Sequence, residues 1–278
     1  LSQNTLTKLV NHKLYDQLHA ATTTLHRTIL DNMNGPASGS WIYPNPQSTQ
    51  NLTDLHYTTA LKLRLGIAVH THDHSCKHNN NGTQCSQPLD THAHHSLTCA
   101  TGPHRTQRHD NIKITLNKWI KTHGYHTQLE RHTPDLDTHH DDGSHTKAIV
   151  DIVATQDTQV HYIDVTVTSP LTTETVTHDQ PPSTKNPTQR REQDKRRKYH
   201  NHCNLQPFVL TTYGKLGHDA ITPLRRMAPT DPETRSESLN RIYHDIATTL
   251  QHGNAESILA SQPTPHPSTR PPTTNPTI

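Results

Sequence analysis

The chain has 278 residues and a net charge of +2, and Leu, Ile, Val and Phe together make up less than a fifth of it. So few apolar residues would indicate disorder if the net charge were high, but this weakly charged chain favours a small ordered core within polar loops. No stretch approaches the ~20 apolar residues of a membrane span, and no signal peptide is recognisable. Because Leu1 stands in place of Met, we expect a fragment or a processed product.

Apolar residues at helical spacing open the chain. They predict a helix within residues 1–34 and another over residues 51–66, with a turn-rich stretch at 35–46 between them. The apolar positions are Leu6, Leu9, Val10, Leu14 and Leu18 in the first helix, and Leu52, Leu55, Leu61 and Leu65 in the second. We therefore expect residues 1–70 to form a helical N-terminal region.

Three of the four cysteines, Cys76, Cys85 and Cys99, lie among histidines within residues 71–103. This clustering favours a metal site over a disulfide framework, and thiolate and imidazole ligands favour Zn²⁺. The alternative is three unrelated cysteines, because coding bias toward A and C explains most of the 27 histidines. Cys203 lies outside the cluster and is expected to be a packed thiol.

The clearest pattern in the chain runs over residues 104–228. It predicts a helix over 107–123, strands over 125–131, 147–155 and 160–168, a basic helix over 189–202, a strand over 205–213 and a helix over 218–227. We expect residues 134–145 to be an acidic loop and 170–187 a mobile one. Strands interleaved with helices indicate an α/β fold in which helices flank a mixed sheet.

The end of the chain changes in character. A helix over residues 233–251 is predicted within a C-terminal segment that spans residues 229–255. Residues 256–278 are rich in proline, which indicates a disordered tail.

Asp151 and Asp164 each lie within an apolar strand pattern, IVDIV and YIDVTV. Burying a carboxylate there costs several kcal/mol unless something compensates for it. A hairpin would bring the two acids side by side, and a pair of carboxylates needs a cation such as Mg²⁺ between them. Glu130, at the end of the preceding strand, is a candidate third oxygen ligand.

The basic helix provides the positive charge that phosphodiester hydrolysis requires. Lys195 and Lys198 are three residues apart and therefore share one helix face, with Tyr199 beside both. Arg196 and Arg197 are expected to contact DNA phosphates. A solvated basic helix without a ligand is the simpler alternative.

Six short motifs occur in one order: HHSLTC, RHD, a Glu closing the next strand, the two acids with DVTV, KRRKY and QPFVLTTYG. This order, over roughly residues 41–224, resembles the restriction-like endonuclease region that follows the reverse transcriptase in non-LTR retrotransposon polyproteins. The resemblance implies a variant of the PD-(D/E)xK nuclease fold. It also implies nicking of target DNA in the nucleus, with the rest of the polyprotein and the element RNA as partners.

The resemblance assigns roles to individual residues. Asp151 and Asp164 correspond to the metal-binding acids, and Lys195 or Lys198 replaces the lysine that usually follows the second acid by two residues, where this chain has Thr166. Arg108 and His109 match a motif that contacts DNA or lines the site. The proline that usually precedes the first acid is Val150. A real Pro-Asp pair, Pro134–Asp135, is set aside because it lies in a loop.

The resemblance also assigns a structural zinc knuckle. Cys85, His95 and Cys99 keep the family arrangement, with His94 as a possible substitute for His95. Cys76 is the fourth candidate ligand, although it lies nine residues before Cys85. An NNNG insertion at residues 79–82 would explain this long spacing.

Two other classes of function remain open on the sequence. One is a zinc-containing module that binds nucleic acid without cleaving it, and the other is the remnant of a decayed element. The geometry of Asp151, Asp164 and the lysines distinguishes the enzyme from both.

Overall fold

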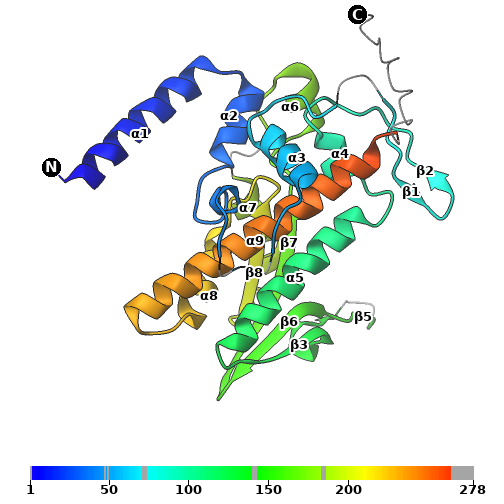
Figure 1. The fold of residues 1–278 in the computed structure, drawn as a ribbon. Helices are drawn as coiled ribbons and strands as arrows, with labels where there is room; N and C mark the ends of the chain where they lie inside the picture. The colour runs from blue at the N-terminus through cyan, green and yellow to red at the C-terminus, as the bar shows by residue number, and fades with distance from the viewer. Residues whose placement is uncertain are drawn as a thin grey trace, which may run out of the picture.

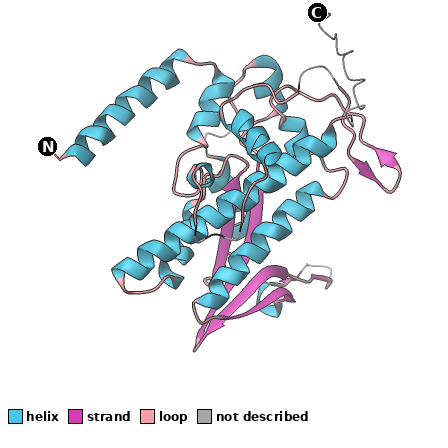
Figure 2. Ribbon diagram, in the orientation of Figure 1, coloured by secondary structure: helices cyan, strands magenta, loops and turns pink. Residues whose placement is uncertain are grey.

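In the computed structural model, the described residues are 2–46, 48, 50–70, 74–139, 143–182 and 186–263. They form a four-stranded mixed sheet flanked by helices, as predicted, with a helical N-terminal region and a cysteine-bearing segment beside it (Figures 1 and 2). Within these residues no helix is both long enough and apolar enough to cross a membrane.

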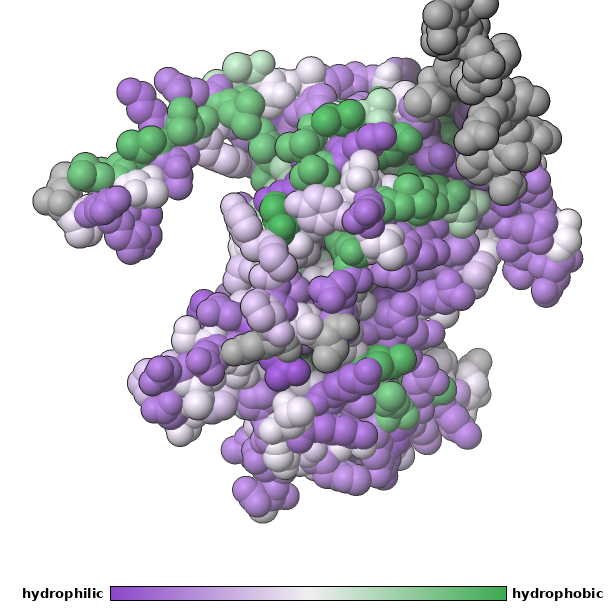
Figure 3. Space-filling model, in the orientation of Figure 1, coloured by the Kyte–Doolittle hydropathy of each residue, from purple (hydrophilic) through white to green (hydrophobic). Residues whose placement is uncertain are grey.

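The N-terminal region is helical, but it is divided differently from the prediction. Residues 1–34 give two helices, α1 (Gln3–Ala21) and α2 (Thr24–Asp31), and a 3₁₀ turn η1 (Ser40–Ile42) leads to α3 (Asp54–Arg64). Helix α1 projects from the body of the protein and buries none of its residues (Figure 3). Its predicted apolar face is therefore exposed, with Leu9 and Leu14 56% and 57% accessible.

The sheet has the strand order β3-β6-β7-β8. Strands β3 (His126–His132), β6 (Ile149–Gln156) and β7 (Gln159–Thr168) are antiparallel neighbours, while β8 (Leu205–Thr211) runs parallel to β7. A two-residue turn joins β6 to β7, and its first residue, Asp157, has a left-handed backbone with φ 51°. A parallel partner requires a crossover, which α6 (Thr173–His178) and α7 (Pro187–Lys198) provide.

Local signals explain where the long helices begin and end. Helix α5 (His104–Thr122) stops before Gly124, whose φ of 83° suits glycine. Helix α7 starts with Asn186 as its N-cap and proline at the first helical position. Helix α8 (His218–Met227) follows β8, and α9 (Pro232–Ser261) starts in the same way as α7, with Asp231 as the cap.

Helices α5 and α9 pack together over the sheet in one main core. Its members include Ile112, Leu116 and Trp119 of α5, Ile152, Ile163, Phe208 and Leu210 of the sheet, and Ile242, Ile246 and Leu250 of α9. A second cluster, which includes Val153, Tyr162, Tyr199 and Leu205, lies between the sheet and the end of α7. Because α9 shares the main core, it does not form the separate C-terminal segment that the sequence suggested.

Two further predictions are wrong. Helix α9 continues to Ser261, ten residues past the predicted end, because Ile258 and Ser261 are fully buried against neighbouring segments. The stretch expected to be a mobile loop contains α6, which Asp179 ties to the start of α2 by accepting bonds from Thr24 N and Leu25 N. The tail beyond residue 263 lies outside the described residues.

The alternation of strand β6 is interrupted beside Asp151. Val150 and Val153 belong to the same core cluster although they are an odd number of residues apart. On the neighbouring strand, Glu130 has a left-handed backbone with φ 50°, which costs free energy in a residue with a side chain. The irregular backbone of both strands therefore coincides with the predicted site.

Candidate functional site

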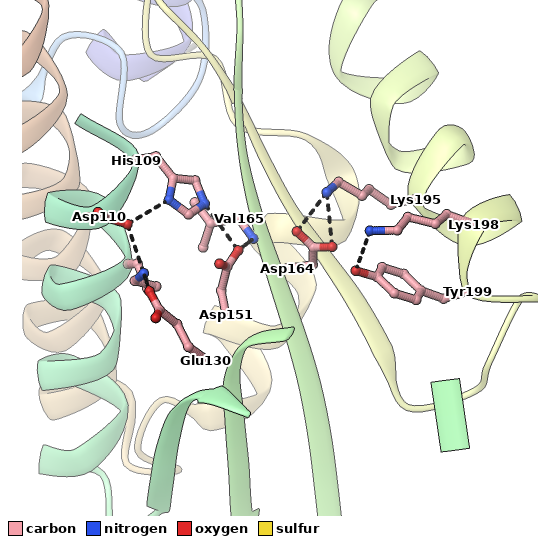
Figure 4. Close-up of polar contacts among 10 residues, drawn as sticks. His109, Asp110, Glu130, Asp151, Asp164, Val165, Lys195, Lys198 and Tyr199 are labelled. Atoms are coloured by element: carbon pink, nitrogen blue, oxygen red, sulfur yellow. Dashed lines mark hydrogen bonds and ion pairs between the residues drawn. The ribbon is translucent and has the colours of Figure 1, made fainter. Parts of the chain in front are cut away.

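Asp151 and Asp164 line one hollow of about 430 Å³ at the end of the β6–β7 ladder. The last pair of this ladder joins Ile152 to Ile163, so the next step in the same register sets the two aspartates opposite each other. The other predicted residues that line the hollow are Arg108, His109, Lys195, Lys198 and Tyr199. The close-up in Figure 4 shows the two acids on either side of the β7 ribbon.

The carboxylate of Asp151 is held from two sides. Its Oδ2 accepts a bond of 2.7 Å from the backbone N–H of Val165 and lies 3.2 Å from Nε2 of His109 (Figure 4). Burial raises the pKa of Asp151, but the contact with His109 and the backbone bond outweigh it, and the net pKa is below its usual range. The same contact with Asp151 raises the pKa of His109.

Asp164 is almost fully buried and faces the basic helix. Lys195 Nζ donates to both of its carboxylate oxygens, at 2.8 and 3.0 Å. Lys198 Nζ lies 3.0 Å from the hydroxyl of Tyr199 rather than beside the acid. Burial and then the charge of Asp164 raise the pKa of Tyr199 well above its usual range, so this phenol stays protonated. The structure thus distinguishes the two lysines, which the sequence left equivalent.

Glu130 is not placed as a third ligand. Its side chain is 63% exposed and forms an ion pair with Lys113, which also bonds Asp110 at 2.8 Å. Asp110 in turn lies 3.1 Å from Nδ1 of His109. Asp110 and Lys113 were missed as site residues, although Asp110 belongs to the RHD motif and helical spacing puts Lys113 one turn after His109.

Arg108 does not reach the surface as a DNA contact would. It is 4% exposed, and its guanidinium donates to Asn254 Oδ1 and to the carbonyl of Leu97. Burial lowers its pKa to about 10. Gly253 makes room for it, because a Cβ there would lie 2.7 Å from Arg108 Cγ. Arg108 therefore connects α5 to α9 and to the cysteine segment.

Two arginines of the basic helix are already paired. Arg196 contacts Asp219 at 2.7 Å, and Arg197 contacts Asp194. By contrast, Arg190 and Arg105 border a second hollow of about 360 Å³, for which no Asp or Glu is among the described lining residues. This hollow adjoins the first, since Arg105, Arg108 and Val167 line both. The unpaired positive charge thus lies nearer the N-terminal end of α7 than predicted.

The four predicted zinc ligands come together in the cysteine segment. Candidate ligand atoms of Cys76, Cys85, His95 and Cys99 all lie within 4.8 Å of one another. The sulfurs of Cys76 and Cys99 are 4.0 Å apart, and Cys85 Sγ lies 3.4 Å from His95 Nε2. A tetrahedral Zn²⁺ site with 2.3 Å bonds to sulfur has edges of about 3.8 Å, so the donor set and its spacing fit this ion.

Local structure accounts for the long spacing between Cys76 and Cys85. The intervening residues form a hairpin of β1 (Asn79–Asn80) and β2 (Thr83–Gln84), whose turn residues Asn81 and Gly82 both have positive φ. On the other side of the site, α4 (His94–Thr98) begins where the Asp90 carboxylate accepts bonds from the backbone N–H groups of His94 and His95. This cap orients His95, and it was not anticipated.

Three secondary expectations have separate outcomes. His94 is not within the cluster, and its Nδ1 lies 3.4 Å from Ser169 Oγ instead. Cys203 is exposed, so the prediction of a packed thiol is wrong. Asp135 of the Pro-Asp pair accepts a bond from the hydroxyl of Tyr162, which gives it a structural partner away from the hollow.

The His109–Asp151 contact predicts a pH dependence of stability. Because the folded-state pKa of His109 is raised, its contribution is fully present below the unfolded value and is lost as pH rises through the folded value. Urea unfolding of the wild type and of His109→Gln should therefore differ most near pH 6, and the difference should shrink by pH 9. A difference that stays constant over this range would contradict the assignment.

Comparison with known proteins adds no assignment: no family model matches the chain, and no curated protein matches it.

Proposed function

We propose that this chain is a metal-dependent endonuclease that nicks DNA. The observation that carries the proposal is the shared hollow in which two strand-borne carboxylates, Asp151 and Asp164, lie together with Lys195 bonded to the second. Carboxylate oxygens are the ligands that Mg²⁺ prefers in proteins. Bound there, Mg²⁺ would polarise the scissile phosphate and ionise a water molecule.

The residues around the acids have separate tasks in this proposal. In the present structure each acid has a basic side chain as its partner: His109 lies 3.2 Å from Asp151, and Lys195 contacts Asp164 at 2.8 Å. With a divalent cation held by the two carboxylates, the ammonium of Lys195 would be free to donate to the phosphate, whose negative charge grows in the transition state. Tyr199 stays protonated beside Lys198 and fixes the end of α7 in the core.

The second hollow provides a path for the DNA backbone away from the acids. Arg105 and Arg190 border it, and the buried charge of Arg108 lies behind it without a carboxylate in contact. Uncompensated positive charge in a concave surface attracts phosphate. We therefore assign the neighbouring phosphate of the cut strand to this hollow, and not to Arg196 or Arg197.

Arg190→Ala should weaken DNA binding at low salt and reduce the slope of log affinity against log salt by about one, the value for one lost phosphate contact. Arg197→Ala is the matched control, because it lies two turns along the same helix but is paired with Asp194. The slope of log affinity against log salt should change much less in Arg197→Ala than in Arg190→Ala. Equal slopes for both variants would show that α7 contributes only a general basic surface.

Nicking of supercoiled plasmid tests the function itself. The wild-type chain should convert supercoiled to open-circular DNA with Mg²⁺ and should not do so with EDTA. Binding without cleavage under the same conditions would favour the nucleic-acid-binding alternative. The further steps, priming of reverse transcription at the nick in the nucleus by a larger polyprotein, are supported by the resemblance of the ordered motifs.

A further inference from the structure

A second group of potential metal ligands lies outside both sites described so far, where α3 crosses α9 (Figure 1). His56 comes from α3, while His252 and Glu256 are four residues apart on one face of α9. The three candidate ligand atoms lie within 4.8 Å of one another. His56 Nε2 is 2.7 Å from Glu256 Oε1, and the two imidazole rings have centroids 4.3 Å apart.

The surroundings fix the orientation of His56. Its Nδ1 lies 3.0 Å from Thr53 Oγ1, so that Nε2 points toward Glu256. A metal-binding histidine is commonly oriented in this way, with one ring nitrogen held by a neighbouring oxygen and the other free to ligate. The side chain is only 12% exposed, which also restricts its movement.

A simple ion pair does not account for all three residues. His56 and Glu256 could form one by themselves, but His252 brings a second imidazole against the first ring, and two protonated rings there would repel each other. A shared cation gives both imidazoles and the carboxylate the same partner. In a tetrahedral zinc site the ligand atoms are about 3.4 Å apart, so His56 and Glu256 need to separate by less than an ångström.

We propose that His56, His252 and Glu256 bind one Zn²⁺ ion, in addition to the ion expected at the cysteines. Two imidazoles and one carboxylate are a donor set that zinc takes in proteins, with water in the fourth position. The ion would fasten the N-terminal region to α9. His252 and Glu256 lie on either side of Asn254 in the sequence, and Asn254 accepts a hydrogen bond from Arg108 of α5. The ion would therefore stabilise the part of α9 that contacts α5.

Metal stoichiometry of the full chain tests this site independently of any nuclease activity. We expect two equivalents of tightly bound Zn²⁺ per wild-type chain, and two spectroscopically different sites with Co²⁺. The cysteine site should show thiolate-to-cobalt charge transfer, and the second should show only weaker ligand-field bands. A chain that binds one equivalent, with all cobalt absorption of the thiolate type, would overturn the proposal.

Variants locate the second equivalent. Glu256→Gln and His252→Asn should each weaken zinc binding at this site by more than roughly 10–100-fold, the loss expected when only a hydrogen-bond partner of a ligand is removed, and should leave the cysteine site loaded. His12→Asn is the matched control, because His12 and Asp16 also form a histidine–carboxylate pair one helical turn apart, but in an exposed position without a third ligand. Equal loss in the control, or a second equivalent retained in both variants, would place the ion elsewhere among the histidines.

Discussion

Asp164→Asn protein should fold normally, bind DNA and fail to nick it. Asparagine has nearly the same size, and its carbonyl oxygen can still accept a bond from Lys195, so the buried environment is preserved. The substitution removes the charge that a divalent cation requires, and we expect the nicking rate to fall at least on the order of 10²–10³-fold. DNA affinity without metal should be unchanged or higher, because one carboxylate no longer repels phosphate.

The control for this experiment is Asp194→Asn. Asp194 also lies beside basic residues, Arg191 and Arg197, but outside the hollow, so that its loss removes a charge without touching the acids. Nicking by this variant should stay close to the wild-type rate. The catalytic assignment fails if Asp164→Asn and Asp194→Asn nick DNA equally fast while both remain folded by circular dichroism.

Cys85→Ser should lose the zinc of the cysteine site and much of its thermal stability. Bound zinc at a thousand times its dissociation constant contributes about 4 kcal/mol to the free energy of unfolding. For a chain of this size that corresponds to a fall in Tm of roughly 8–16 °C. Loss of the zinc should also destabilise the contact between the cysteine segment and α9. Ser257 of α9 donates to the carbonyl of Ser96, and its own carbonyl bonds to His78.

Cys203→Ser is the control, since this thiol is exposed and lies outside the cluster. It should keep its zinc and its Tm. Zinc affinity of the wild type should fall as pH drops, because zinc needs thiolates and burial raises the pKa of the metal-free Cys76 thiol to about 12. Full zinc content in Cys85→Ser protein, measured by elemental analysis, would remove Cys85 from the ligand set.

The sheet could be predicted because its signals are local. The strands that carry Asp151 and Asp164 are rich in β-branched residues, and each of the four predicted strands appears within two residues of its expected start and end. Within these apolar strand patterns the two acids are unusual, so Asp151 and Asp164 could be predicted as site residues from the sequence. Lys195 could not be separated from Lys198, because helical spacing gives a shared face but not the partner opposite.

What the sequence could not supply was burial and long-range contact. Arg108 stands beside His109 in a basic, polar stretch, and nothing local indicates that Asn254, 146 residues later, covers it. The apolar residues of α1 predicted a helix correctly, but they did not predict that its apolar face is exposed. Periodicity shows which face of a helix is apolar, but not whether another segment covers that face. Helix α9 is longer than predicted. Its last turns contain polar residues such as Ser257 and Ser261, which are buried and form hydrogen bonds, and polar residues do not indicate a buried helix in the sequence.

The position of α9 has a consequence for the synthesis of this chain on the ribosome. The part of the main core that Ile242, Ile246 and Leu250 complete stays uncovered until residues 232–261 have emerged. At about 5–20 residues per second, the 50 residues from the end of β8 at 211 to the end of α9 at 261 take roughly 3–10 s. During that interval the uncovered apolar surface is open to association with other chains.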